Sequence, residues 1–176
     1  MGLRNVSLGE NPPHLINVVV ECPKGSTNKY EYDLDSGTIR LDRVLFSPLY
    51  YPFDYGYVPD TLYIDGDPLD ALVVLSHPTF PGCIVEAKPI GVLEMSDEKG
   101  RDEKLLCVAA RDPRFSHWEN LSHLSRHRQK EIIHFFEVYK VLEEKSVEVK
   151  GWHDVDVAKN LIEQFRMDKP RANTQF

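Results

Sequence analysis

The segment Asp65–Asp70, with the sequence DGDPLD, places three carboxylates within six residues. Two like charges about 4 Å apart repel by roughly 4 kcal/mol at an effective dielectric constant near 20, so such a cluster either spreads into water or is neutralised by cations. The apolar run Ala71–Leu75 follows at once and predicts a buried strand, which keeps the carboxylates from spreading freely. Because the donors are all oxygen, the segment predicts a site for Mg²⁺ or Mn²⁺ rather than for zinc.

Two other acidic motifs match this segment less well. An EF-hand loop needs Asp or Asn at its fifth position and Gly at its sixth, where Leu69 and Asp70 stand. The phosphoaspartyl phosphatases of the haloacid dehalogenase superfamily carry a strand-terminal DxD, usually as DxDxT or DxDxV, which the segment matches only in part. A phosphomonoesterase of that class therefore stays open as an alternative.

Other charged residues could take part in the same chemistry. Asp97 and Asp102 lie between two predicted strands, where the simplest interpretation is an exposed hairpin tip. His123 and His127 have the spacing of two zinc ligands, but Leu124 stands where HExxH needs its glutamate, so we interpret both as surface residues. Further acidic, basic and phenolic candidates are Glu21, Glu31, Lys29, Arg43, Tyr55, Lys104, Tyr139 and Lys140.

Length and charge restrict the class of protein. The 176 residues suit one domain, which we expect to cover residues 1–176, with residues 170–176 as a frayed tail. A net charge of −7 disfavours nucleic acid and anionic membranes as partners.

The apolar runs are far shorter than the ~20 residues that cross a bilayer, and no signal peptide is evident, so we expect a cytoplasmic protein. Cys22, Cys83 and Cys107 are expected to be buried and reduced.

Short strands followed by helices indicate an α+β fold, in which helices pack against a small β-barrel. Alternation over Thr38–Val44 predicts a half-buried strand, and the Ser36-Gly37 pair before it predicts a hairpin turn. Pro48–Pro68 lacks any period, and we expect a long ordered loop there. Helical spacing predicts helices over Arg126–Glu143 and Asp154–Arg166, the second capped by Asp154. The other predicted strands are Ile16–Cys22, Lys29–Asp33, Ala71–Leu75, Ile84–Met95 and Lys104–Ala109.

The segment Asp65–Asp70 resembles the D-G-D-P-hydrophobic-D signature of the soluble family I inorganic pyrophosphatases, and Leu69 is its hydrophobic residue. The resemblance covers most of the chain, in order and at the spacing of that family, and such an agreement is too long to arise by chance. It runs through Glu21, Lys29-Tyr30-Glu31, Asp42-Arg43, Tyr51-Pro52, Tyr55-Gly56-Tyr57, Gly91-Val92-Leu93, Asp97 to Asp102, Lys104, His134-Phe135-Phe136-Glu137, Tyr139-Lys140 and Gly151-Trp152.

The resemblance implies a five-stranded, OB-like barrel with two or more helices packed on it, and hydrolysis of pyrophosphate to two orthophosphates. It also implies several Mg²⁺ ions per site, with Mn²⁺ or other divalent ions possible, and a homohexamer, the usual state of the compact prokaryotic type. By position, Asp67 would be the general base and Tyr55 would hydrogen-bond near the nucleophile. The implied metal ligands are Asp65, Asp70, Asp97, Asp102 and Glu21, and the implied substrate-binding residues are Lys29, Arg43, Tyr139, Lys140, Lys104 and Glu31.

General chemistry agrees with this assignment. An acidic pocket would repel the highly charged pyrophosphate unless divalent ions lay between them. Two metal ions ~3.5–4 Å apart can bind one water, lower its pKa and aim it in line with the leaving group. We therefore hypothesise a direct in-line attack by a metal-activated water, with no phosphoenzyme; phosphate trapped covalently on Asp67 or Asp65 after acid quenching would refute it.

Three positions depart from the family pattern. Asp54 stands where the family usually has Asn, Asp60 where a neutral residue is more usual, and Cys22 where a branched aliphatic follows the glutamate. We expect the two extra carboxylates to shift the metal affinity or the pH optimum. A non-enzymatic OB-type module that binds oligonucleotides is a third interpretation, but it would need a basic groove with exposed aromatics, which the net charge disfavours.

Overall fold

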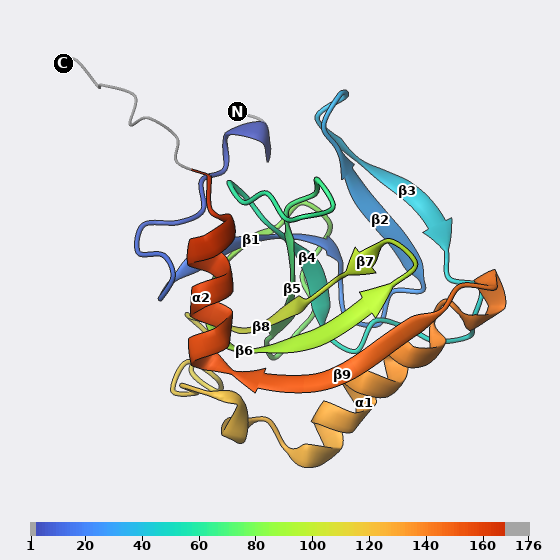
Figure 1. The fold of residues 1–176 in the computed structure, drawn as a ribbon. Coiled ribbons are helices and arrows are strands. Elements are labelled where there is room, and N and C mark those ends of the chain that lie inside the picture. Colours follow the sequence, from blue (N-terminus) through green and yellow to red (C-terminus); the bar gives the residue numbers. More distant parts are fainter. Residues whose placement is uncertain (1–2, 168–176) are drawn as a thin grey trace.

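The computed structural model describes residues 3–167, which form nine β-strands, two α-helices and three short 3₁₀ helices (Figure 1). The tail expected to fray, residues 170–176, lies outside this range. The strands are β1 (Ile16–Cys22), β2 (Asn28–Asp33), β3 (Thr38–Val44), β4 (Asp54–Val58), β5 (Leu69–Val74), β6 (Ile84–Asp97), β7 (Gly100–Arg101), β8 (Lys104–Ala109) and β9 (Val147–Asp154). The helices are α1 (Arg126–Val138) and α2 (Val155–Phe165), with η1 (Leu3–Asn5), η2 (Leu121–His123) and η3 (Val141–Glu143).

Five strands pair in a closed ring. β1 pairs with β4, β4 with β5, β5 with β8 and β8 with β6, and β6 returns to β1. Of the five pairs in this ring, which all lie within residues 3–167, only β5–β8 is parallel. β7 and β9 both extend the sheet from β6, while β2 and β3 form a separate hairpin to one side (Figure 1). The expected α+β class with a five-stranded barrel is therefore confirmed.

Strand β4 corrects the expectation of a loop over Pro48–Pro68. All five of its residues are buried, so no alternation of polar and apolar residues marks it in the sequence. Gly56 lies at its centre, where a Cβ would come 2.0 Å from the carbonyl oxygen of Val19 on β1. Glycine is therefore required for the close approach of these two strands.

Two hydrophobic cores hold the helices against the barrel. In one core, Tyr51 and Tyr55 pack with Ile132, Phe135 and Phe136 of α1. The other core joins the opposite part of the barrel to α2 through Ala158, Leu161 and Ile162. As expected, Asp154 caps α2, and its side chain accepts a hydrogen bond from the Val155 N–H group.

The C-terminal third differs from the prediction in two elements. Helix α1 ends at Val138 rather than Glu143. Tyr139 is its C-cap, and Val141–Glu143 form the separate 3₁₀ helix η3, which ends at Glu144 in a left-handed conformation with a φ of 57°. Strand β9 was not predicted, although Val147 and Val149 alternate with charged residues at its start.

Cys22 and Cys107 are buried as expected, whereas Cys83 is only half-buried. Residues 3–167 contain no helix long and apolar enough to cross a membrane.

Candidate active site

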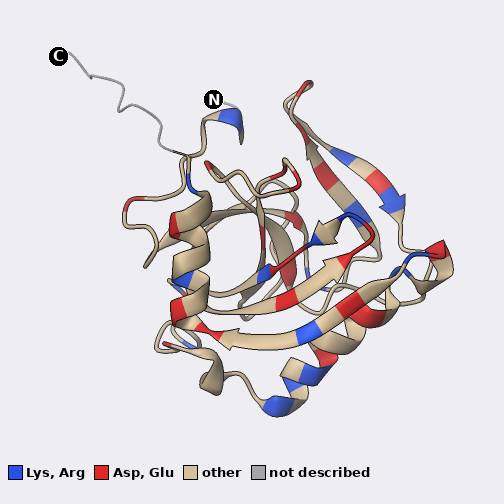
Figure 2. Cartoon of the chain, viewed as in Figure 1, with Lys and Arg blue, Asp and Glu red and all other residues tan. Residues whose placement is uncertain are grey.

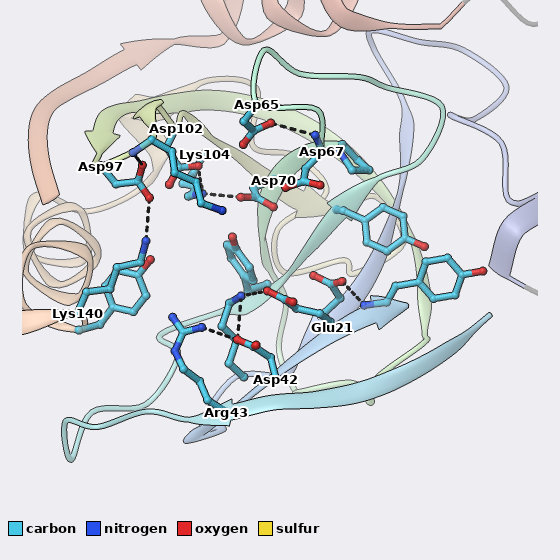
Figure 3. A pocket seen from close by; sticks show the side chains of 18 of the residues that line it. Glu21, Asp42, Arg43, Asp65, Asp67, Asp70, Asp97, Asp102, Lys104 and Lys140 are labelled. Atoms are coloured by element: carbon cyan, nitrogen blue, oxygen red, sulfur yellow. Dashed lines mark hydrogen bonds and ion pairs between the residues drawn. The ribbon is translucent and has the colours of Figure 1, made fainter. Parts of the chain in front are cut away.

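One cavity of about 430 Å³ opens beside the barrel, between the β2–β3 hairpin, the β4–β5 turn, the β6–β7 hairpin and the end of α1 (Figure 3). All thirteen residues proposed above as metal ligands, substrate-binding groups or catalytic groups line it. Charges of both signs alternate along the surrounding hairpins (Figure 2). Five further charged residues line the cavity and were not predicted as site residues: Asp42, Glu98, Lys99, Arg101 and Lys145.

The turn between β4 and β5 carries the acidic segment. Gly66 has a φ of 93°, which a residue with a Cβ rarely adopts, and the turn folds back so that the Asp67 N–H group donates to Oδ1 of Asp65 at 3.0 Å. Burial raises the pKa of the Asp67 carboxyl, and the charge of Asp65 raises it further. The turn therefore presents a carboxylate with increased proton affinity to the cavity.

Lys104 lies between two carboxylates at the floor of this cavity. The parallel register of β5 and β8 pairs it with Asp70, and its Nζ lies 2.5 Å from an oxygen of Asp70 and 2.5 Å from one of Asp102. The residue is only 2% exposed. Burial lowers the pKa of Lys104, but the two carboxylates raise it by more, so the ammonium group stays charged and neutralises part of the acidic cluster.

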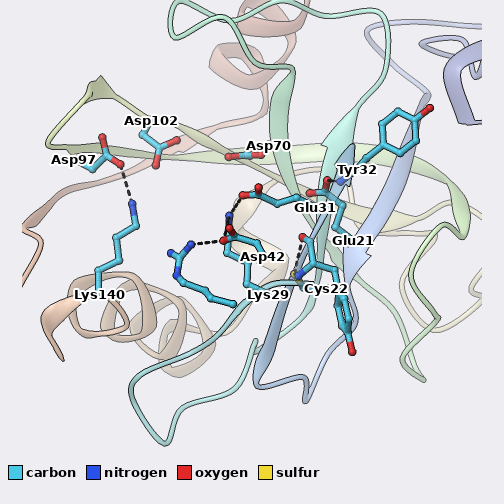
Figure 4. Close-up of polar contacts among 12 residues, drawn as sticks. Glu21, Cys22, Lys29, Glu31, Tyr32, Asp42, Asp70, Asp97, Asp102 and Lys140 are labelled. Atoms are coloured by element: carbon cyan, nitrogen blue, oxygen red, sulfur yellow. Dashed lines mark hydrogen bonds and ion pairs between the residues drawn. The ribbon is translucent and has the colours of Figure 1, made fainter. Parts of the chain in front are cut away.

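The opposite wall of the cavity is formed by cations that are paired with carboxylates (Figure 4). Lys140 follows the end of α1 and contacts Asp97 at 2.8 Å. Lys29 on β2 pairs with Glu31 and lies 3.5 Å from Asp42. Carboxylates thus hold both ammonium groups at the cavity wall, and an anion that enters the cavity can take the place of a carboxylate as their partner.

Arg43 bridges two parts of the chain that are far apart in sequence. It pairs with Asp42, and its Nε donates to Glu143 of η3 at 2.9 Å. Glu143 thereby fixes β3 to the segment that follows α1, and it orients the guanidinium group toward the cavity.

Two buried groups complete the site. Oε1 of Glu21 accepts a hydrogen bond of 2.7 Å from the Tyr32 N–H group, and burial raises the pKa of Glu21 to about 8 despite that bond (Figure 4). Burial also raises the pKa of Tyr55, and the charges of Asp70 and Asp102 add to the shift. The phenol of Tyr55 therefore stays protonated and can act as a hydrogen-bond donor.

Asp54, one of the departures from the family pattern, does not line the cavity, and neither does Asp60. Asp54 is fully buried. Its Oδ1 accepts a hydrogen bond from the Lys24 N–H group at 2.8 Å, and its Oδ2 accepts two from Thr79, from the N–H group at 2.9 Å and from Oγ1 at 2.6 Å. The carboxylate thus fastens two loops to β4, and the structure gives no support to an effect of Asp54 on metal ions in the cavity.

Replacing Asp54 with Asn should leave kcat within about tenfold of the native value, a difference of ~1.4 kcal/mol in activation free energy. The free energy of unfolding should fall by about 1–3 kcal/mol, because an amide NH₂ would face at least one of the donors now bound by the carboxylate. Urea unfolding and steady-state kinetics measure both quantities. Thr79→Val removes one donor to the same carboxylate and should also lower the free energy of unfolding without changing kcat. A kcat loss well beyond tenfold for Asp54→Asn would contradict this assignment.

The donor groups fit a hard divalent cation. No three acidic, imidazole or thiol groups within residues 3–167 converge at metal-ligand spacing, and Lys104 instead occupies the space between Asp70 and Asp102. The groups around that space are nevertheless oxygen donors of the kind that Mg²⁺ prefers. Burial raises the pKa of Asp102 as it does that of Asp67, and Asp70 raises it further. Burial is the larger cause of both shifts, and a bound divalent cation would favour the charged form of each carboxyl.

Comparison with known proteins agrees with this geometry. A family model described as inorganic pyrophosphatase matches residues 18–168. An inorganic pyrophosphatase of Synechocystis sp. is 53% identical over 150 residues, which are 85% of this chain and 89% of that protein. One from Sulfolobus acidocaldarius is 46% identical over 161 residues, 90% of this chain and 93% of the relative. The crystal structure of inorganic pyrophosphatase from Thermus thermophilus superposes with a TM-score of 0.90 at 44% identity, covering 93% of this chain and 95% of that one.

Proposed function

The chain belongs to the inorganic pyrophosphatase family, and on this premise we propose that its cavity hydrolyses pyrophosphate to two orthophosphates by direct in-line attack of water, with divalent cations as cofactors. The observation that carries the proposal is the presence of both charges in one cavity: carboxylates that can hold cations face lysines and an arginine that can hold phosphate. A phosphoaspartyl phosphomonoesterase and an oligonucleotide-binding module, the two alternatives, are disfavoured by the family match over most of the chain.

The carboxylates that would hold the cations are Asp65, Asp70, Asp97, Asp102 and Glu21, all of which line the cavity. When bound, the cations would neutralise these groups and the substrate and would lower the pKa of the attacking water. Lys104 would hold Asp70 and Asp102 in place and would contribute one positive charge to this group of carboxylates.

The phosphate groups would be bound by Lys29, Arg43, Tyr139 and Lys140. Lys29 and Lys140 are paired with carboxylates at the cavity wall, so an entering polyanion would compete with those partners. The guanidinium of Arg43 can give two parallel hydrogen bonds to phosphate, and its charge would stabilise the leaving group. Glu31, the present partner of Lys29, would lie at the edge of the site.

Asp67 would act as the general base. Its raised pKa favours acceptance of a proton from the attacking water, and its turn holds the carboxylate at the cavity surface. The protonated Tyr55 would donate a hydrogen bond near the nucleophile. The proton passes from water to the Asp67 carboxylate, the new P–O bond forms as the bridging P–O bond breaks, and no phosphate is attached to the protein.

Phosphate release from pyrophosphate tests the proposal directly. We expect release with Mg²⁺, a loss of at least about a hundredfold in excess chelator, and recovery when Mg²⁺ is restored to the same sample. Circular dichroism of the chelated sample controls for unfolding. Absence of release with any divalent ion would contradict the proposal, and release from sugar or nucleotide monophosphates alone would favour the phosphomonoesterase.

The assembly and the location of the protein remain predictions. The homohexamer is consistent with the exposed apolar side chains of Leu41, Val44, Phe46 and Tyr50 on β3 and the segment after it. The expected cytoplasmic location likewise stays a prediction.

A further inference from the structure

Arg101, on β7, lines the cavity but is not paired with any of the carboxylates proposed as metal ligands. Its Nε and Nη2 both donate to Oε1 of Glu103, the Nε bond measuring 2.7 Å. No hydrogen bond joins Nη1 to an acceptor within residues 3–167, and the side chain is 56% exposed. Arg101 therefore keeps N–H groups available at the rim of the cavity.

Glu103 holds this guanidinium group from a buried position. Its side chain is only 4% exposed, and its second oxygen accepts a hydrogen bond from the hydroxyl group of Tyr63. The Tyr63 ring is itself buried and packs edge-on against Phe165 of α2, with 4.7 Å between the ring centroids. Both carboxylate oxygens thus have donors, as a buried charge requires, and the guanidinium is bound to a rigid support.

Tyr63 also holds the turn that carries the proposed base. Its N–H group donates to the carbonyl oxygen of Asp67 at 2.7 Å, and its carbonyl oxygen accepts from the Gly66 N–H group at 3.1 Å. One residue therefore connects the backbone of the Asp67 turn, through Glu103, to the guanidinium group of Arg101. The positions of the base and of the guanidinium are coupled in this way.

We propose that Arg101 is a further substrate-binding residue that contacts a phosphate oxygen at the cavity rim, and that Glu103 and Tyr63 are positioning residues acting through it. The inference rests on the proposed function, which supplies pyrophosphate as the anion. Lys29 and Lys140 already use part of their donor capacity on carboxylates of the cavity wall, whereas Arg101 can bind phosphate through Nη1 while Glu103 holds its Nε and Nη2. A planar guanidinium group fixed in this way matches phosphate geometry and loses little side-chain freedom on binding.

The first test compares Arg101→Gln and Arg101→Lys at saturating Mg²⁺. For Arg101→Gln, KM for pyrophosphate should rise about tenfold while kcat stays within about threefold, the pattern of a lost binding contact. Arg101→Lys should give an intermediate KM, because it keeps the charge but not the forked contact with Glu103. Arg111→Gln is the matched control: Arg111 is 87% exposed, pairs with Glu86 at 3.3 Å and lies outside the cavity, and its loss changes the net charge equally.

The second test places Glu103→Gln and Tyr63→Phe in the native and Arg101→Gln backgrounds. Each should raise KM about threefold in the native background and add nothing once Arg101 is replaced, which a merely structural role would not produce. An unchanged KM for Arg101→Gln, or an equal rise for Arg111→Gln, would overturn the role of Arg101. A KM effect of Glu103→Gln that persists without Arg101 would overturn the positioning role. Failure of the proposed function would appear separately, as a native protein without Mg²⁺-dependent phosphate release.

Discussion

An Asp67→Asn variant is expected to hydrolyse pyrophosphate about a thousandfold more slowly than the native chain, because general-base catalysis contributes ~10²–10⁴ in rate. Asparagine has nearly the same shape as aspartate but cannot accept the proton of the attacking water. The turn should keep its conformation, since its contacts at this residue use the backbone: the N–H group binds Asp65 and the carbonyl oxygen accepts from Tyr63. The measurement is kcat at saturating pyrophosphate and Mg²⁺.

Asp156→Asn is the control for this experiment, since Asp156 is an exposed carboxylate in the first turn of α2 and lies outside the cavity. It should leave both kcat and KM unchanged. If Asp67→Asn kept kcat within tenfold of the native value, another group would have to accept the proton, and the assignment of Asp67 would be wrong. If KM rose while kcat held, the carboxylate would serve binding rather than proton transfer.

The elements that the sequence predicted are those whose pattern is local. The apolar run of β5 and the alternation of β3 can be recognised without knowing their neighbours in space. Strand β4 could not be recognised in this way, because both of its faces are buried and Gly56 is required by the close approach of the β1 backbone. Its identity depends on contacts with β1 and β5, which lie at other places in the chain.

The position of Asp54 away from the cavity could not be predicted for the same reason, and its expected effect on metal affinity or pH optimum stays a prediction. With Pro48–Pro68 taken as a loop, Asp54 seemed to lie beside the site because it adjoins Tyr55. In a strand, successive side chains point to opposite faces, so a residue next to Tyr55 points away from the cavity that Tyr55 lines. Once β4 is recognised, the hydrogen bonds from Lys24 and Thr79 to Asp54 follow from that alternation.

The candidate site was predicted where its residues belong to a recognisable motif and missed where they act through long-range contacts. The acidic segment and the cations appear in the family pattern, and the structure brings them all to one cavity. The partners that hold those residues do not appear in any local pattern. Glu143 and Arg43 form a hydrogen bond although they are 100 positions apart in the sequence, and Tyr63 and Glu103 do so at a separation of 40. Such pairs are fixed by the tertiary fold, and one sequence gives no sign of them.

Replacing Lys104 with Met should lower the free energy of unfolding by about 3–5 kcal/mol in the presence of chelator, because the loss of one partner leaves buried charges uncompensated. The methionine side chain fills a similar volume, but Asp70 and Asp102 would face each other without the ammonium group that now lies 2.5 Å from each. Urea unfolding at neutral pH measures the difference. Lys150→Met is the control, since Lys150 is exposed and lies 3.5 Å from Glu94 at the surface, where an ion pair contributes about 0–1 kcal/mol.

The pH dependence of this difference separates charge from packing. Burial and the charge of Asp70 raise the pKa of Asp102, so this carboxyl gains a proton as the pH falls. Its protonation would remove the repulsion in the variant, and in the native protein it would remove the attraction of Asp102 to Lys104. The destabilisation caused by Lys104→Met should therefore shrink as the pH falls from 7 toward ~4, the usual range of carboxyl titration. A destabilisation of the same size at both pH values would mean that Lys104 stabilises the barrel by packing, and that the carboxylates of the cavity do not depend on its charge.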